Sequence, residues 1–182
     1  LDGSTIIVHG NGQDAIGDTM NNGEIFIHGN CGDTTGYAMR SGKIFVKGNA
    51  GYRVGIHMKE YHEFYPKIII GGKVGDFLGE YQAGGLIVVL SLHTDGRPVV
   101  GYFPCTGMHG GKMVFRGDVS NIPFPPQVTS RPATEEDMAK FAPYVRESCR
   151  LFHLDPEQLL RDAYTVITPD SKNPYQQMYV AN

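Results

Sequence analysis

Short apolar segments recur along the first two-thirds of the chain at a nearly constant spacing. The segment from Gly23 to Gly36 repeats 19 residues later as Gly42 to Gly55, and the same step backwards places it on Ser4 to Gly17. Each copy has an apolar stretch, then a glycine-rich loop, then a polar turn. Repetition at a fixed period is typical of proteins in which stacked units bury a common core.

Three further copies are less regular. A fourth copy starts at Ile68 after a five-residue insertion and keeps its glycine loop up to Gly79. A fifth starts at Gly85 and lacks the glycine triplet, and a sixth, from Gly111 to Asp118, keeps the strand but loses the loop. The predicted unit is therefore a short strand, then GxxGxxxG, then a polar turn.

The length of the period decides which repeat fold we predict. A unit of 19 residues with one strand has no room for a helix and its turns, which argues against leucine-rich and α-helical repeats. Short strands stacked about 4.8 Å apart would bury a continuous core. We therefore predict an all-β fold: a right-handed parallel β-helix (single-stranded) of about six rungs with a small C-terminal helical appendage.

Glycine is unusually abundant, with 24 glycines in 182 residues against a usual share of about 7%. We expect the repeated glycines at corners that need positive φ, or where neighbouring rungs approach closely. A phosphate-binding loop is disfavoured because GxxGxxxG matches neither nucleotide-binding pattern and recurs several times. The predicted structural glycines are Gly10, Gly17, Gly29, Gly32, Gly36, Gly48, Gly51, Gly55, Gly72, Gly75 and Gly79.

Both faces of the predicted strands are apolar. One face carries pairs such as Ile25 and Ile27, and the other carries a single column that includes Phe26, Phe45 and Ile69. A strand of a β-helix turns one face inward and the other outward, so the outer column needs a cover. We favour a cover formed by the chain's own C-terminal segment over one formed by a partner protein, roughly two to one.

The chain changes in character after residue 120. We divide it into a glycine-repeat β-helix over residues 1–120, a proline-rich extended linker over 121–133, and a helical segment with an extended tail over 134–182.

Two helix starts are readable in the last part. Thr134 with Asp137 in the third helical position predicts a capped helix, and Pro143 predicts a kink or a division into two short helices. Asp155, followed by proline, predicts a second helix that runs to about Tyr164, with an extended remainder.

Composition and charge exclude several functions. The formal net charge is −3 and no basic patch stands out, so we expect no nucleic-acid partner. The apolar run over residues 84–92 is too short to span a bilayer, and no signal-peptide pattern is present. Three widely spaced cysteines without a CxxC motif indicate free thiols rather than a metal centre. We therefore expect a cytoplasmic protein without membrane contact.

Two longer loops hold the candidates for chemistry or binding. The insertion over residues 58–67 mixes aromatic and polar side chains. Residues 57–63 could form an acid/base cluster, but we prefer to interpret this loop as a contact surface. The loop over 93–110 contains Cys105 and His109, which resemble a nucleophile–base pair. The candidate interface residues are His57, Tyr61, His62, Phe64, Tyr65, Arg97 and Phe103.

Two histidines could suggest a metal site, but we interpret their position as a solvated polar edge. His9 and His28 occupy the same position of consecutive repeats, where stacked imidazoles could bind a metal ion. Lys47 and Arg116 occupy that position in later repeats, which favours a solvated polar edge. We therefore predict no metal site.

The repeats also resemble a known family. The segments HGNCGDTTGYAMRSG, KGNAGYRVGIHMKEY and IIIGGKVGDFLGEYQAGGLIVVL look like the GXGXG domain that closes the large subunit of glutamate synthase. The same domain resembles one subunit of formylmethanofuran dehydrogenase, which is likewise non-catalytic in the resemblance. The resemblance covers about residues 3–120. It implies a structural domain that bridges flavin and glutaminase domains, and it carries over no catalytic residue.

The function implied by this resemblance is that of a non-catalytic scaffold, a domain or subunit of a glutamate-synthase-type complex in glutamate biosynthesis. No cofactor is expected in this chain, whereas FMN and an iron–sulfur cluster are expected in partner subunits. The expected partners are the other subunits or domains of that complex, and a homo-oligomer stays open. The alternatives are the corresponding non-catalytic subunit of formylmethanofuran dehydrogenase and an independent enzyme that uses the loop at 57–63 or at 105–109.

Overall fold

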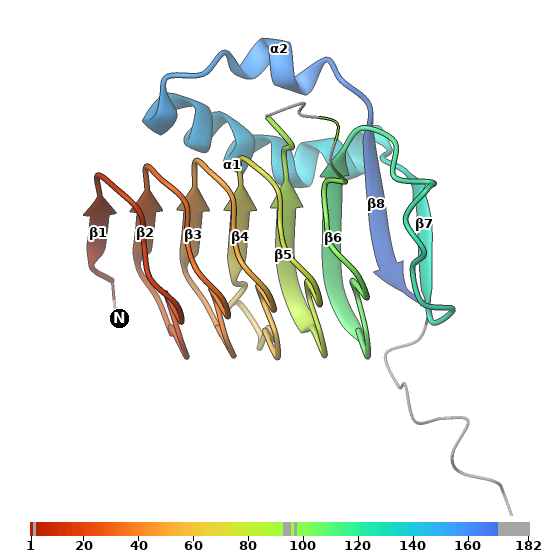
Figure 1. Ribbon diagram of the computed structural model, residues 1–182, viewed down its shortest axis with the longest axis horizontal. Helices are drawn as coiled ribbons and strands as arrows, with labels where there is room; N and C mark the ends of the chain where they lie inside the picture. The colour runs from red at the N-terminus through yellow and green to blue at the C-terminus, as the bar shows by residue number, and fades with distance from the viewer. Residues whose placement is uncertain (2, 93–95, 97, 171–182) are drawn as a thin grey trace, which may run out of the picture.

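The strands of the repeats lie side by side in one sheet (Figure 1). The computed structural model describes residues 1, 3–92, 96 and 98–170. Within this part of the chain eight strands form one sheet, in the order β1-β2-β3-β4-β5-β6-β8-β7. The strands are β1 (Thr5–Val8), β2 (Glu24–Ile27), β3 (Lys43–Val46), β4 (Lys67–Ile70), β5 (Ala83–Val89), β6 (Gly110–Arg116), β7 (Val128–Pro132) and β8 (Tyr164–Pro169).

The register of the first six strands follows the repeat. These strands are parallel, and Ile25 pairs with Ile44, which pairs with Ile68, which pairs with Ile87. The next strand continues the column, because Ile87 pairs with Met113. The hydrophobic spacing read from the sequence therefore predicts these pairings, since a shift by one residue would turn each side chain to the other face.

The predicted fold class is wrong. The sheet is mixed rather than all-parallel, because β8 pairs antiparallel with both β6 and β7. An 18-residue helix, α1 (Glu135–Phe152), and a shorter one, α2 (Pro156–Leu160), complete an α/β-type sheet structure rather than an all-β right-handed β-helix. The repeat pattern could not reveal this, because the strands and helices that change the class come from sequence outside the repeats.

The loops between the strands are stacked as regularly as the strands. The backbone N–H of Gly29 donates to the carbonyl of Gly10 at 3.0 Å, and that of Gly48 donates to Gly29 at 2.9 Å. The side chains of Asn11, Asn30 and Asn49 each accept from the N–H of a residue one coil further on. Each loop therefore satisfies many of its backbone polar groups on its neighbours.

Each glycine loop turns through three left-handed residues at alternate positions. In the third loop these are Arg53, Gly55 and His57, with φ of 55°, 68° and 56°. The loop after β5 has the same conformation at Phe103, Cys105 and Gly107, although the sequence pattern predicts no glycine loop there. Cys105 takes the place that glycine holds in the earlier loops, which is why the pattern of glycines misses this fifth turn.

The inward side chains of the strands pack against the glycine turns. Ile27, Val46, Ile70, Val89 and Phe115 are all fully buried in this first cluster. Methionines from the turns fill the space beside them, and Met39 and Met58 are also fully buried. The repeated unit thus builds its own core, as the pattern of apolar positions predicts.

The opposite face of the sheet is covered by the C-terminal helices. Phe26 and Phe45 stack with ring centroids 5.1 Å apart and lie in a second cluster with Phe141, Val145 and other residues of α1. Figure 1 shows α1 running across the strands. The prediction that the chain's own C-terminal segment covers the outer column is confirmed.

The C-terminal elements differ from the prediction in four places. β7 lies inside the predicted linker, and β8 lies where an extended tail is predicted. α1 runs through Pro143 as one helix, and the proline is exposed, so the carbonyl that loses its donor faces solvent. α2 ends at Leu160, short of the predicted end. The capping box of Thr134 and Asp137 is confirmed.

Candidate functional site

The stacked turns place their outward side chains in columns along one edge of the molecule. The N–H of Arg53 donates to the carbonyl of Asp76 at 2.9 Å, and that of Phe77 donates to Tyr102 at 2.8 Å. Equivalent bonds join His57 to Glu80 and Tyr81 to Thr106. A side chain in one turn therefore lies beside its counterpart in the next, about one strand spacing away.

These columns are rich in aromatic rings, and we call this surface the aromatic edge. The imidazole of His57 stacks on the ring of Tyr81, with centroids 5.2 Å apart and planes at 9°. Phe77 stacks on Phe103 at 5.3 Å, and the guanidinium of Arg53 lies 4.9 Å from the Phe77 centroid. The aromatic edge comprises Tyr37, Tyr52, Arg53, His57, Phe77, Glu80, Tyr81, Tyr102 and Phe103.

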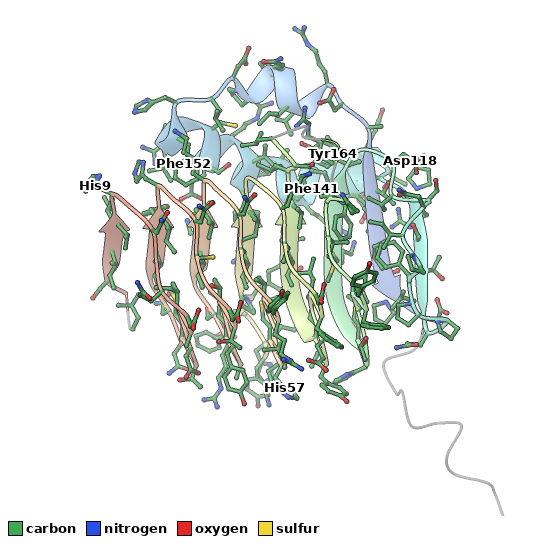
Figure 2. All side chains as sticks on the ribbon, viewed as in Figure 1. His9, His57, Asp118, Phe141, Phe152 and Tyr164 are labelled. Carbon is green, nitrogen blue, oxygen red and sulfur yellow. The ribbon has the colours of Figure 1, made fainter. Side chains whose placement is uncertain are left out.

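Several rings of the aromatic edge are open to solvent. Tyr102 is 72% exposed and Phe103 is 62% exposed. Figure 2 shows His57 at the edge of the molecule that lies away from the helices and from His9. Clustered exposed rings of this kind are more typical of contact surfaces than of solvated faces.

The insertion before β4 forms a tight hairpin. The N–H groups of Tyr61 and Phe64 each donate to the other's carbonyl at 3.0 Å, and His62 between them has φ of 53°. The His62 ring packs edge-on against Tyr61 with centroids 4.1 Å apart. Tyr61 and Phe64 are exposed. The hairpin thus presents two apolar rings on a backbone fixed by two hydrogen bonds.

A groove lies beside this hairpin, and we call it the basic–aromatic groove. It has a volume of about 510 Å³ and is lined by Asn21, Arg40, Lys59, Tyr61 and Phe64. Arg40 and Lys59 are not singled out from the sequence, although they follow Met39 and Met58 at one 19-residue step. The 19-residue repeat could have revealed both residues, because equal positions in consecutive units become neighbours in the structure.

Tyr65, another predicted interface residue, is turned toward α1. It packs against the second cluster, and burial raises its pKa to about 12. The ammonium of Lys67 lies 5.3 Å from the Tyr65 ring and 5.4 Å from the Tyr144 ring, and burial lowers the pKa of Lys67. Tyr65 therefore helps to seat α1. Arg97 lies outside the described residues.

The Cys105–His109 pair does not form. Cys105 is fully buried, its Sγ lies 3.7 Å from the Met113 sulfur, and burial raises the pKa of the thiol to about 12. His109 Nδ1 lies 3.0 Å from the carbonyl of Gly107. A thiol held protonated in the core is a poor nucleophile, so this conformation does not support catalysis by the pair.

The two stacked histidines lie on another part of the surface. The rings of His9 and His28 have centroids 5.4 Å apart, and His28 also packs edge-on against Phe152 of α1. No group of three or more metal-ligating side chains is found among the residues with a described position. Of the later residues in this column, Arg116 binds the carboxylate of Asp162 and the carbonyl of Leu90.

The described helices are also unsuited to a bilayer. None of the helices in the described ranges is both long and apolar enough to cross a membrane.

The stacked glycine turns and the in-register parallel strands define a repeat domain in which each unit consists of one strand and one turn. Residues 1–169 match the GXGXG motif family, which is the family of the glutamate synthase C-terminal domain. The chain is also 46% identical over 185 residues to an uncharacterized protein of Methanocaldococcus jannaschii, a match that covers 98% of this chain and 71% of the relative. The chain therefore belongs to the GXGXG motif family, and the resemblance to the glutamate synthase domain is confirmed.

Proposed function

We propose that this chain is a scaffold of a glutamate-synthase-type complex, in which it holds flavin-containing and amidotransferase partners in place while those partners carry out the reactions. The observation that carries the proposal is the family match over residues 1–169, nearly the whole chain. In this role FMN and the iron–sulfur cluster belong to the partner subunits.

The architecture supports a scaffold role. The sheet presents one continuous edge of stacked turns, and many of its backbone hydrogen bonds join neighbouring coils. Such an edge is rigid over its whole length because moving one turn would break bonds to both neighbours. A rigid, flat, aromatic surface suits the docking of another folded protein, because little conformational entropy is lost on binding.

The side chains of the predicted loops support the same role. His57 and Phe103 lie on the aromatic edge, and Tyr61, His62 and Phe64 lie on the hairpin beside the basic–aromatic groove. They are arranged as ring contacts on a surface. We expect this surface to contact the partner subunits.

The test is co-purification from the native host. Affinity-tagged chain, isolated under mild conditions, should bring down a partner with the visible spectrum of flavin and an iron–sulfur cluster. When a two-electron reductant is added, the eluate should form glutamate from glutamine and 2-oxoglutarate. Isolation of a pterin-containing partner would favour the formylmethanofuran dehydrogenase alternative. A chain that elutes alone, with an activity of its own, would contradict the scaffold role.

A further inference from the structure

The basic–aromatic groove combines two kinds of binding group in one small surface. Its cations come from two adjacent coils, because the N–H of Lys59 donates to the carbonyl of Met39 at 3.1 Å and Arg40 follows Met39 directly. Its rings come from the hairpin that begins two residues after Lys59. Tyr61 is 65% exposed and Phe64 is 45% exposed.

The two cations have no carboxylate partner within the described part of the chain. Several other basic side chains are paired, as Arg53 is with Glu80 at 3.0 Å and Lys43 with Glu147 at 2.8 Å. No ion pair or hydrogen bond of the side chains of Arg40 or Lys59 is found among the described residues. Two adjacent unpaired cations raise the local potential for an anionic group.

The two acidic residues nearest the groove in the sequence, Glu60 and Glu63, are not among its lining residues. A carboxylate oxygen of Glu60 accepts the N–H of Gly85 at 2.8 Å, and Glu60 lines a different pocket beside α1. Glu63 is an exposed residue of the hairpin turn. A docked segment must therefore place its carboxylates against the column of Arg40 and Lys59 rather than against the tip of the hairpin.

The hairpin is extra to the repeat. The pairing of Lys43 with Lys67 requires a step of 24 residues, whereas Glu24 pairs with Lys43 after 19. The stacking of β3 and β4 therefore does not need these added residues. The hairpin exposes two aromatic rings that reduce solubility and do not pack in the core. Exposed rings of this kind are typical of a binding surface.

We propose that the basic–aromatic groove docks an acidic segment of a partner polypeptide, with carboxylates on Arg40 and Lys59 and an aromatic or aliphatic side chain between Tyr61 and Phe64. The inference rests on the proposed scaffold role and names the chemistry of the docked partner. Charge complementarity requires an acidic ligand. The rings are open to solvent rather than enclosed, so a polypeptide that extends beyond the groove covers them better than a small anion does.

A defined peptide tests the docking directly. The probe is a fluorescein-labelled peptide with the core Glu-Glu-Phe-Leu-Glu-Glu, measured by fluorescence anisotropy in about 50 mM and about 300 mM salt, conditions in which exposed charges are differently screened. We expect saturable binding that weakens as salt rises. Amide shifts of the labelled protein should cluster at residues 21, 40, 59, 61 and 64.

Variants assign the binding to the groove. Arg40→Glu with Lys59→Glu should weaken the peptide about tenfold or more, corresponding to about 1.4 kcal/mol. The charge-matched control, Arg150→Glu with Arg161→Glu, changes two exposed cations on the helices and should leave the affinity within about twofold. Tyr61→Ser with Phe64→Ser should also weaken binding, and a peptide with lysine in place of glutamate should not bind. Circular dichroism confirms that each variant is folded.

Three outcomes would overturn the docking proposal: no binding of the acidic peptide at about 1 mM, equal binding of the lysine peptide, or equal weakening by the control pair. Binding of free glutamate or inorganic phosphate as tightly as the peptide would assign the groove to a small anion instead.

Co-purification with the Arg40→Glu, Lys59→Glu variant separates this failure from failure of the scaffold role. If the variant retains the flavin-containing partner as well as the unaltered chain does, the docking proposal fails and the scaffold stands. If the unaltered chain brings down no such partner but binds the peptide, the scaffold proposal fails instead.

Discussion

Gly48 and Gly10 occupy the same position of the repeat but have different surroundings. A Cβ on Gly48 would lie 2.8 Å from the carbonyl oxygen of Gly29 and 2.3 Å from Asn30 Oδ1 in the coil beneath. A Cβ on Gly10 would meet nothing within 4 Å, because no described coil lies beneath the first one. The need for glycine at this position therefore comes from stacking rather than from a left-handed backbone.

This contrast gives a prediction at the scale of one residue. Gly48→Ala should lower the free energy of unfolding by about 2–4 kcal/mol, because the new methyl group separates two hydrogen-bonded loops. Gly10→Ala should change it by no more than about 0.5 kcal/mol. Urea denaturation of both variants measures the difference. Similar stabilities for the two variants would contradict the stacking explanation.

A second class of glycine is required by conformation. Gly17, Gly36, Gly55 and Gly79 have φ between 65° and 73°, where a Cβ would also press on a buried side chain of a later coil. Cys105 adopts the same conformation with φ of 61°. A left-handed residue other than glycine costs about 1–2 kcal/mol, and here the side chain is accommodated in the core beside Met113.

At the scale of elements, one carboxylate links the start of α1 to two strands of the sheet. The carboxylate of Asp137 accepts the N–H of Thr134, the N-cap of α1, at 3.1 Å, pairs with Arg131 of β7 at 2.5 Å, and pairs with Lys112 of β6 at 3.1 Å. The Arg131 guanidinium is the main cause that holds the pKa of Asp137 far below its usual range. This side chain therefore joins two strands to the start of the helix that covers the sheet.

The pH dependence of stability should report this link. Because the pKa of Asp137 is lower in the folded than in the unfolded state, its carboxylate stabilises the folded state at pH values above the unfolded pKa of about 3.8. This stabilisation is lost as the pH falls below that value. Asp137→Asn should therefore cost about 1–3 kcal/mol between pH 5 and 8, and the difference from the unaltered protein should shrink below about pH 4.

Glu136→Gln is the matched control for that prediction. Glu136 is the preceding residue and pairs with Lys140 on the exposed surface, so its replacement should change the free energy of unfolding much less than Asp137→Asn does. Urea unfolding at several pH values measures both variants. A pH-independent loss in the Asp137 variant would show that the charge of Asp137 does not contribute.

The first strand differs from the others in its surroundings. Ile6 and Ile7 of β1 are 43% and 51% exposed, whereas Ile25 and Phe26, their partners in β2, are 6% and 3% exposed. β1 carries the same residue pattern as β2, and it lies at the edge of the sheet. Burial of a repeat unit is therefore decided by its neighbours rather than by its own sequence.

At the scale of the whole molecule, the predicted division at residue 120 cuts through one sheet. β8 lies between β6 and β7, and α1 buries the column of rings on the outer face. Val114 of β6 pairs with Val166 of β8, and both are buried in the second cluster. The repeats and the C-terminal segment therefore contribute strands to one sheet.

Truncation tests whether the repeats need the C-terminal segment in order to fold. A chain ending at residue 120 should lose its cooperative thermal transition and bind a hydrophobic dye, because the face with Phe26, Phe45 and Ile69 becomes exposed. The full chain, measured under the same conditions, is the reference. A cooperative melt of the shorter chain would show that the repeats fold alone.

The sequence by itself determined what is local and periodic. The 19-residue step sets the register of β1, β2 and β3, the alternation of their faces, and the positions of most glycine turns. It also predicted the capping box of α1 and a cover from the chain's own C-terminal segment. These features follow from backbone geometry that each unit repeats, so the spacing of residue types is enough to reveal them.

The tertiary structure decided what depends on contacts between distant segments. It places β8 between β6 and β7, which changes the fold class, and it forms a fifth turn around Cys105 where the glycine pattern fails. It also brings Arg40 and Lys59 beside the rings of Tyr61 and Phe64. Such neighbours are selected by packing over the whole molecule, because the free energy of burying a face depends on the element that covers it.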